Sequence, residues 1–237
     1  MDANEFKGLQ ANITSGLREF GGRRNGARGI VRHQIRPVAA AVVIGIGGTG
    51  IQVISRVRAG VHADRPDQEA TSALAFLGID AVDELQQNPP LPPGVTLSGG
   101  EFLNLRGFDA HNYITGQRPN DPFLRAWWED QYDVPRGPLN EGLKRERMLG
   151  RLCFHRWNTE LQTKIGSAMS VANAVRSEHI GAGQVVPSGG VIHVYVVCSS
   201  AGGTGSAGFL ETVMAIHAAA QSLSLTPHIR AFVEIKP

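Results

Sequence analysis

Two stretches of the chain share one pattern, in which a short apolar run leads through glycines into a helical repeat. The first is Ala40–Val57, AAVVIGIGGTGIQVISRV, and the second is Val191–Phe209, VIHVYVVCSSAGGTGSAGF. Both apolar runs are rich in β-branched residues and nearly continuous, which is typical of strands buried on both faces of a parallel sheet. After each glycine cluster, apolar residues recur every three or four positions, which predicts an amphipathic helix. Each stretch therefore predicts a strand, a glycine turn and a helix in succession.

The remaining pattern predicts more elements of the same kind. Apolar runs at Ala73–Ile79 and His228–Ile235 predict two further strands. A helical repeat predicts one long helix over Gly142–Ser177, and a shorter repeat predicts a helix within residues 1–20. Strands that alternate with helices indicate an α/β fold, here a Rossmann-like three-layer sandwich with a mainly parallel sheet. Residues 101–141 show no such repeat and are predicted to be a long loop insertion.

Composition and charge describe a globular protein with one unusual segment. Of the 237 residues, 42% are hydrophobic and 19% are charged, and the formal net charge is +2. This composition excludes a disordered chain, and near-neutrality gives no reason to expect nucleic acid or a membrane surface as a partner. Residues 1–36 are expected to form an N-terminal helix and a basic arm, separate from a domain at 37–237. The arm carries Arg23, Arg24, Arg28, Arg32 and Arg36 and no acidic residue, so it is either a solvated segment or a contact for an acidic partner or neighbouring subunit.

Cysteine usage and hydropathy indicate the cellular setting. The two cysteines, Cys153 and Cys198, lie far apart and have no cysteine or histidine neighbour at metal-binding spacing. No disulfide framework or zinc site is therefore expected, and a reducing compartment is favoured. No stretch approaches the roughly 18–20 apolar residues that a membrane span requires. We expect a cytoplasmic protein without a membrane segment or metal-ligating residues, in which His155, His193 and His217 are structural.

A strand that passes through glycines into a helix N-terminus is an anion-binding site made by the main chain. The glycines let backbone N–H groups approach the ligand, and the helix dipole adds partial positive charge. In the second stretch the glycines 202, 203 and 205 lack the Cβ that would obstruct a phosphate, while Thr204 and Ser206 can donate hydroxyl hydrogen bonds. An isolated cluster of this kind can equally be a flexible turn. Because two clusters occur in one domain, we expect them to hold one polyphosphate between them.

Together the two clusters resemble the phosphate-binding loops of the tubulin/FtsZ family of GTPases. The family's first loop is a glycine cluster that ends in Asn or Gln, matched here by Gly45–Gln52, GIGGTGIQ. Its signature loop reads GGGTG, then Ser or Thr, then Gly; Ala201–Ala207, AGGTGSA, keeps the GGTGS and has alanine at both outer positions. We call these two segments the first and second glycine corners. Within the family, the chain looks most like the divergent bacterial tubulin-like proteins.

The resemblance implies a site for GTP or GDP, with Mg²⁺ bound through the phosphates. It assigns phosphate contacts to residues of both corners, namely Gly47, Gly48, Thr49, Gly50, Gln52, Gly202, Gly203, Thr204, Gly205 and Ser206. By similarity of the segments LGIDAVDEL and GLKRERMLG to the family, Asp80, Arg147 and Arg151 are expected near the phosphates or the metal. Asp80 has a second interpretation as the N-cap of a helix over Ala81–Leu85. The resemblance further implies head-to-tail self-association into filaments by the full-length protein.

The end of the chain resembles the family's fifth strand, which closes in a Lys-Pro-like pair. In the family, the ribose loop, the base-recognising helix and the loop that completes hydrolysis follow this strand. The expected domain is therefore an incomplete tubulin/FtsZ GTPase domain, truncated after its fifth strand, and no catalytic residue is assigned. By position, residues 101–141 correspond to an enlarged third nucleotide loop that acts as a lid or a subunit contact. Trp127 and Trp128 belong to that loop or are ordinary packing residues.

Two other functions stay open from the residues alone. Gly45, Gly47 and Gly50 satisfy G-x-G-x-x-G, and Asp80 follows Gly50 by 30 residues. An NAD(P)-dependent dinucleotide-binding oxidoreductase domain is therefore an alternative, although it leaves the GGTGS of the second corner unexplained. The other alternative is a nucleotide-binding-dead adaptor that keeps the fold for protein contacts. The first corner lacks the Lys-Ser/Thr ending of a Walker P-loop, which disfavours an ordinary P-loop NTPase.

Overall fold

A five-stranded sheet forms the centre of the molecule, in the order β3-β2-β1-β4-β5, and every neighbouring pair of strands is parallel. The strands are β1 (Ala40–Ile46), β2 (Leu74–Asp80), β3 (Phe102–Asn104), β4 (Val191–Ser199) and β5 (Thr226–Glu234). The computed structural model describes residues 40–64, 73–82, 97, 99–107, 109–129, 143, 146–181 and 190–235. The predicted α/β fold with a parallel sheet is confirmed.

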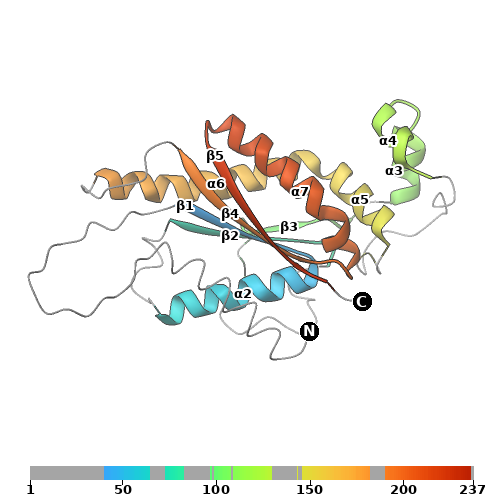
Figure 1. The fold of residues 1–237 in the computed structure, drawn as a ribbon. Helices are drawn as coiled ribbons and strands as arrows, with labels where there is room; N and C mark the ends of the chain where they lie inside the picture. The colour runs from blue at the N-terminus through green and yellow to red at the C-terminus, as the bar shows by residue number, and fades with distance from the viewer. Residues whose placement is uncertain are drawn as a thin grey trace, which may run out of the picture.

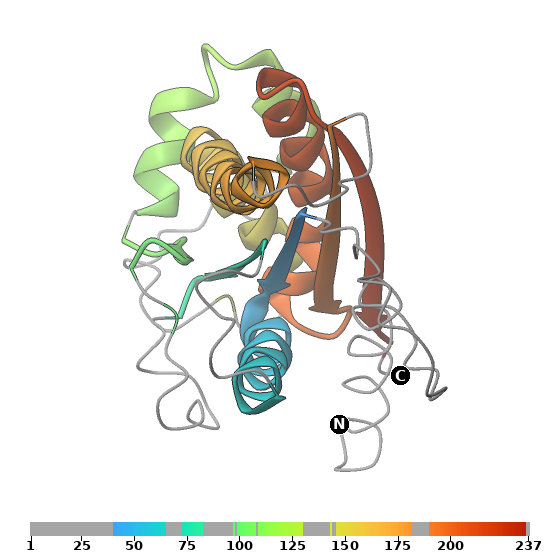
Figure 2. The same ribbon diagram turned by 90° about the vertical axis from the view of Figure 1, so that its left-hand side faces the viewer.

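Helices cover both faces of this sheet. They are α2 (Gly47–Asp64), α3 (Ala110–Gln117), α4 (Pro122–Trp127), α5 (Arg147–Arg156), α6 (Asn158–Gly181) and α7 (Gly203–Ser222). In Figure 1, α2 lies below the sheet and α6 and α7 lie above it, and Figure 2 shows the same three layers from the side. The short helices α3 and α4 lie at one end of the molecule, beyond α5 (Figure 1). The three-layer sandwich predicted from the sequence is therefore the observed architecture.

The central strand β1 is buried on both faces. Its side chains Val42 and Ile44 belong to the core between the sheet and α5, α6 and α7, whereas Val43 belongs to the core between the sheet and α2. All three are fully buried, at 0% exposure. Since successive side chains of a strand point to opposite faces, one apolar run can serve two cores. Each such side chain contributes about 1.5–3 kcal/mol on burial, which fixes β1 and the corner that follows it.

The helix predicted over residues 142–177 is instead two helices that meet at Trp157. The Trp157 amide donates to the Cys153 carbonyl at 2.9 Å and so ends α5, while its carbonyl accepts from the Leu161 amide at 2.8 Å and opens α6. Its backbone (φ −102°, ψ 19°) departs from helical values. The apolar period continues across this point, so hydrophobic spacing alone predicts one helix where the backbone forms two.

Residues 101–141, predicted to be a long loop, contain β3, α3 and α4. Asp109 caps α3 by accepting the Asn112 amide at 2.9 Å, and Asp121 caps α4 by accepting the Leu124 amide at 3.0 Å. Pro122 occupies the first turn of α4, where its missing N–H leaves no bond unmade. These capping residues are start signals of helices that are too short for a clear apolar period.

The tryptophan pair in this region packs within the protein. Trp128 is 4% exposed and belongs to the core beneath α5, α6 and α7, and Trp127 packs against the same core. The two indole rings meet edge to face, with centroids 5.8 Å apart. Of the two interpretations of this pair, ordinary packing is the one that the contacts support.

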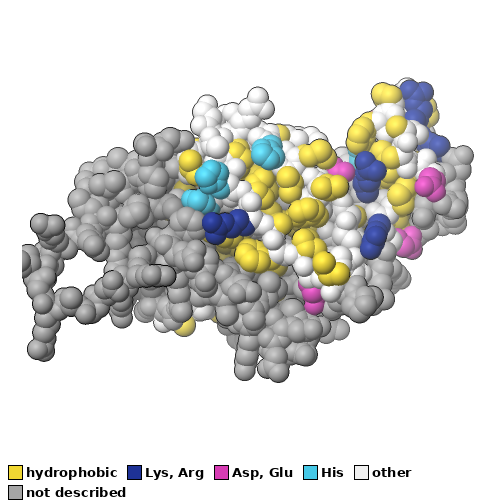
Figure 3. Space-filling model, in the orientation of Figure 1, with side chains coloured by type: hydrophobic (Ala, Val, Ile, Leu, Met, Phe, Trp, Pro, Cys, Tyr) yellow, Lys and Arg dark blue, Asp and Glu magenta, His cyan; other side chains and the backbone are white. Residues whose placement is uncertain are grey.

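The predicted N-terminal helix and basic arm, residues 1–36, lie outside the described residues, as does most of the helix predicted over Ala81–Leu85. Of the helices that are described, none combines the length and the apolar character needed to cross a membrane. Figure 3 shows apolar side chains spread over the face that α7 and β5 form, where Leu210, Met214 and Val233 are exposed.

Candidate functional site

The two glycine corners lie at the carboxyl ends of neighbouring strands. β1 and β4 are adjacent at the centre of the sheet, and the chain leaves them toward opposite edges, through β2 and β3 on one side and β5 on the other. Open parallel sheets bind ligands at such a point, where diverging connections leave a crevice. Gly47 directly follows β1 and Gly203 opens α7 after β4, so both corners lie at this point of the sheet.

The corners are in direct contact. Gly47 has a left-handed φ of +71°. A Cβ built on Gly47 would lie 3.2 Å from the Gly205 nitrogen and 3.4 Å from the Thr204 Cβ. A side chain at position 47 would therefore be strained by its backbone and would push the second corner away. The structure thus brings together the two segments that the sequence separates by more than 150 positions.

Both helices that start at the corners have their N-termini at this switch point. The first four N–H groups of a helix have no partner within the helix, and the helix dipole places partial positive charge there. Neither α2 nor α7 has an acidic residue in its first turn, and the N-cap of α7, Gly202, supplies no side-chain hydrogen bond. This pair of helix ends has the chemistry of an anion site.

The glycines of the corners have different roles. A Cβ on Gly50 would lie 2.4 Å from the Val197 carbonyl oxygen, and one on Gly205 would lie 2.8 Å from the Ser199 carbonyl oxygen. These two glycines let α2 and α7 pack tightly on β4. Gly202 is different, because a Cβ there would meet no heavy atom within 4 Å.

The hydroxyl groups of the second corner are engaged within the protein. Thr204 Oγ1 donates to Asp80 Oδ1 at 2.8 Å in a buried hydrogen bond, and Ser206 Oγ donates to the Gly202 carbonyl. Both hydroxyl groups therefore donate within the protein.

Asp80 ends β2 beside the corners. Asp80 is buried, at 4% exposure, and its Oδ1 also accepts a hydrogen bond from the Ala81 amide at 2.8 Å. β1 and β2 pair in register up to Ile46 and Ile79. The next residue of each segment, Gly47 and Asp80, therefore lies at the same level of the sheet. The structure thus places Asp80 beside the glycine corners, and its partner Thr204 was not predicted.

The other residues assigned to the first corner lie in the first turns of α2. Gly48 and Thr49 belong to its first turn. Gln52 is 6% exposed, and its Oε1 accepts a hydrogen bond from Arg56 Nη1 at 3.0 Å. Gln52 thus lies within α2 and bonds to the following turn of the same helix.

The two arginines predicted near the phosphates are placed differently. Arg147, at the start of α5, donates from Nη2 to the Ser200 carbonyl at 3.2 Å and so lies against the loop between β4 and α7. Arg151 pairs instead with Glu211 of α7 at 3.4 Å, and its guanidinium lies 4.5 Å from the Trp127 ring centroid. The structure brings Arg147 to the second corner and holds Arg151 on α4 and α7.

The alanine at the end of the second corner faces α5. A Cβ built on Gly150 would lie 2.5 Å from the Ala207 Cβ and 2.6 Å from the Gly203 carbonyl oxygen. The methyl group of Ala207 therefore points at α5, where Gly150 leaves room for it. The replacement of an outer glycine by Ala207 is accommodated on this side of the loop.

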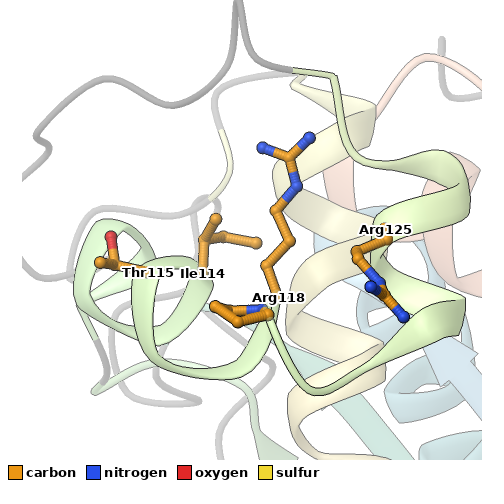
Figure 4. A pocket seen from close by; sticks show the side chains of 5 residues that line it. Ile114, Thr115, Arg118 and Arg125 are labelled. Carbon is orange, nitrogen blue, oxygen red and sulfur yellow. The ribbon is translucent and has the colours of Figure 1, made fainter.

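Two hollows lie away from the corners. Ile114, Thr115, Arg118 and Arg125 line one of about 550 Å³ on α3 and α4 (Figure 4). Residues of α4, α5, α6 and α7, among them Phe123 and Met214, line another of about 420 Å³. Sequence reasoning pointed to neither, because both depend on how α3 and α4 pack beside α5.

Histidines and cysteines of the described region have structural surroundings. His155 joins α5 to α3 and α4, with Nδ1 3.1 Å from the Tyr113 hydroxyl and Nε2 3.1 Å from Asp121 Oδ2. Burial raises the pKa of the Cys153 thiol to about 12 and that of Cys198 to about 11, which makes both poor nucleophiles. Among the described residues, no three His, Cys, Asp or Glu side chains gather as metal ligands would.

Comparison with known proteins agrees with the geometry of the corners. Residues 42–234 match the model of a protein family described as tubulin-like. Neither a search of curated proteins nor a search of solved structures gives a significant match. The family match begins in β1, ends with β5 and so includes both glycine corners. The chain belongs to the tubulin-like family.

Proposed function

We propose that the two glycine corners bind the polyphosphate of GTP or GDP. The observation that carries this proposal is the close approach of Gly47 to Thr204 and Gly205, which sets two helix N-termini side by side. A polyphosphate has several anionic groups and can accept from the first-turn amides of α2 and α7 at once. Arg147, bonded to the Ser200 carbonyl, lies where a guanidinium can approach the same phosphates. The proposed contacts are the ten corner residues named from the sequence, with Asp80 and Arg147 beside them.

Mg²⁺ is proposed to accompany the nucleotide, bound through its phosphates. The buried carboxylate of Asp80 lies one hydrogen bond from Thr204 in the first turn of α7. An anion in this place repels an unscreened polyphosphate, and a carboxylate beside phosphate oxygens is the donor set that Mg²⁺ prefers. When bound, the cation supplies charge neutralisation. The protein's own part is to present amides and to hold the loops in place.

We further propose head-to-tail self-association of the protein into filaments in the cytoplasm. Membership of the tubulin-like family supports this proposal. A heterologous contact repeated from copy to copy builds an open filament instead of a closed ring. We assign no hydrolytic residue to this chain.

The dinucleotide-binding oxidoreductase is less well supported. That function uses only the first corner, in which Gly45 and Gly50 pack against each other: a Cβ on Gly45 would lie 2.6 Å from the Gly50 carbonyl carbon. It gives no role to the second corner, and the family match is to a tubulin-like model.

Direct binding measurements separate the candidate functions. Fluorescent analogues of GTP and ATP, and NADH itself, are titrated separately into the protein with Mg²⁺ present. We expect saturable binding of the GTP analogue that unlabelled GTP and GDP displace. Binding of NADH without GTP would favour the oxidoreductase. Binding of none of the three would favour the adaptor that has lost nucleotide binding.

A matched pair of substitutions at Gly202 tests the position of the phosphates. The backbone there (φ −85°, ψ 150°) suits any residue, and an added Cβ meets nothing within 4 Å. Gly202→Asp adds a carboxylate at the N-cap of α7, which favours the helix by up to about 1 kcal/mol but repels and competes with phosphate. We expect GTP affinity to fall at least tenfold without loss of thermal stability. Gly202→Ala should keep affinity within about threefold, and equal affinity of the two variants would place the phosphates elsewhere.

A further inference from the structure

We propose that Asp80 acts as a positioning residue through Thr204, as a latch that sets the first turn of α7 against β2 and the first corner. This inference rests on the proposed nucleotide site and deepens it, because it assigns the Thr204 hydroxyl to the protein scaffold. The latch is the hydrogen bond from Thr204 Oγ1 to Asp80 Oδ1, which is 2.8 Å long and buried.

The position of the latch in the sheet gives it this role. Asp80 ends β2, Thr204 lies in the first turn of α7, and the strand between β2 and β4 is β1. The hydrogen bond therefore crosses the end of β1 and ties the two sides of the switch point together. The residue that follows β1 is Gly47, whose missing side chain faces Thr204 and Gly205. Any shift of Thr204 away from Asp80 would also change the spacing of the two corners.

Burial makes this hydrogen bond selective for one arrangement. Asp80 and Thr204 are 4% and 6% exposed, so water has little access to replace either partner. If the α7 N-terminus moved away, the buried carboxylate would lose a hydrogen-bond donor that water cannot replace. The free energy of such a position is therefore higher. Asp80 Oδ1 is itself fixed by the Ala81 amide at 2.8 Å. The acceptor Asp80 Oδ1 is thus fixed at the end of β2, and it sets the position of the donor, Thr204 Oγ1.

The latch also explains why the threonine hydroxyl and the phosphate donors are different groups. A hydroxyl has one hydrogen to donate, and in Thr204 that hydrogen points to Asp80. The amides of the α7 first turn remain for the ligand. In this proposal Thr204 offers its backbone amide to the phosphates, and its side-chain hydrogen bond to Asp80 holds that amide in position.

Nucleotide affinity of three variants tests the latch. Thr204→Val removes the hydroxyl and keeps the shape, Thr204→Ser keeps the hydroxyl, and Asp80→Ala removes the acceptor. We expect Thr204→Val and Asp80→Ala each to weaken GTP binding by about tenfold to a hundredfold, the range for losing a buried hydrogen bond to a charged group. The Asp80→Ala/Thr204→Val double variant should be no weaker than Asp80→Ala alone. Thr204→Ser should restore binding to near the natural level.

Hydrogen exchange of the ligand-free protein tests the latch without nucleotide. The first hydrogen-bonded amide of α7 is that of Ser206, which donates to the Gly202 carbonyl at 3.2 Å. We expect amides 206–208 to exchange several-fold faster in Thr204→Val than in Thr204→Ser. Equal exchange in these two variants, or additive affinity losses in the double variant, would overturn the latch. Failure of the natural protein to bind any nucleotide would refute the proposed function, and the exchange result would still decide the latch.

Discussion

Polar side chains at the glycine corners form hydrogen bonds within the protein. Thr204 donates to Asp80, Ser206 donates to the Gly202 carbonyl, and Gln52 accepts from Arg56. None of these partners follows from local sequence: Asp80 and Thr204 are 124 positions apart. A motif can therefore predict that a hydroxyl lies at a phosphate loop, but the direction of its hydrogen is set by the tertiary fold.

The two cysteines should be unreactive in the native protein and should reduce its stability at high pH. Burial raises the thiol pKa values from 9.0 to about 12 for Cys153 and about 11 for Cys198. Below pH 9 both thiols stay protonated whether the chain is folded or unfolded. Above pH 9 only the unfolded chain releases these protons, so their contribution to stability is lost progressively as pH rises from 9 toward the folded values.

A thiol-reactive dye at pH 8, with and without urea, provides the measurement. We expect slow labelling of the native protein and fast labelling of the unfolded chain. The urea midpoint should fall above pH 9, and Cys153→Ala should reduce that fall. Native labelling as fast as in urea would contradict the burial of both thiols.

Among the helices and strands, those with a long apolar period were predictable. β1, β4 and α7 follow from runs in which each residue's hydrophobicity agrees with its place in a buried strand or an amphipathic helix. The break at Trp157 was not, because Leu152, Leu161 and Ile165 continue one period across it and all three are buried. α3 and α4 are too short for a period, and only Asp109 and Asp121 mark where they start.

The caps of α3 and α4 should contribute unequally to stability. Asp109 and Asp121 each accept one backbone amide, but Asp121 also pairs with His155 at 3.1 Å. We expect Asp109→Ala to lower the free energy of unfolding by about 1 kcal/mol, as for an ordinary N-cap, and Asp121→Ala to lower it by more. Urea unfolding followed by circular dichroism measures both. A smaller loss for Asp121→Ala would show that its pair with His155 contributes nothing.

The same carboxylate gives a pH dependence of known sign. The Leu124 amide is the largest of the interactions that lower the pKa of Asp121 below 3.8. The stabilisation by Asp121 is therefore present above pH 3.8 and is lost as pH falls through its lower folded value. Asp121→Asn keeps an acceptor for the Leu124 amide, and its stability should decline less over this acidic range.

The order of the strands in the sheet determines which loops of the chain lie next to each other. Two glycine clusters far apart in sequence lie side by side because β1 and β4 are neighbours and parallel. The sequence predicted both clusters and the kind of sheet. The adjacency of the strands was not predicted, since apolar patterning does not encode strand order.

Self-association should depend on the same site. We expect sedimentation velocity of the protein with GTP and Mg²⁺ to show large species that are fewer with GDP. Gly202→Asp should reduce them in proportion to its loss of nucleotide binding, and Gly202→Ala should not. An unchanged size distribution with and without nucleotide would argue against nucleotide-linked filaments.

The most direct test of a shared phosphate site is the response of backbone amides to nucleotide. Amide chemical shifts of the labelled protein are compared before and after addition of GTP with Mg²⁺. The two corners in contact predict that amides 47–50 and 203–206 both shift and saturate at the same GTP concentration. Shifts confined to one corner, or to neither, would contradict a polyphosphate held between them.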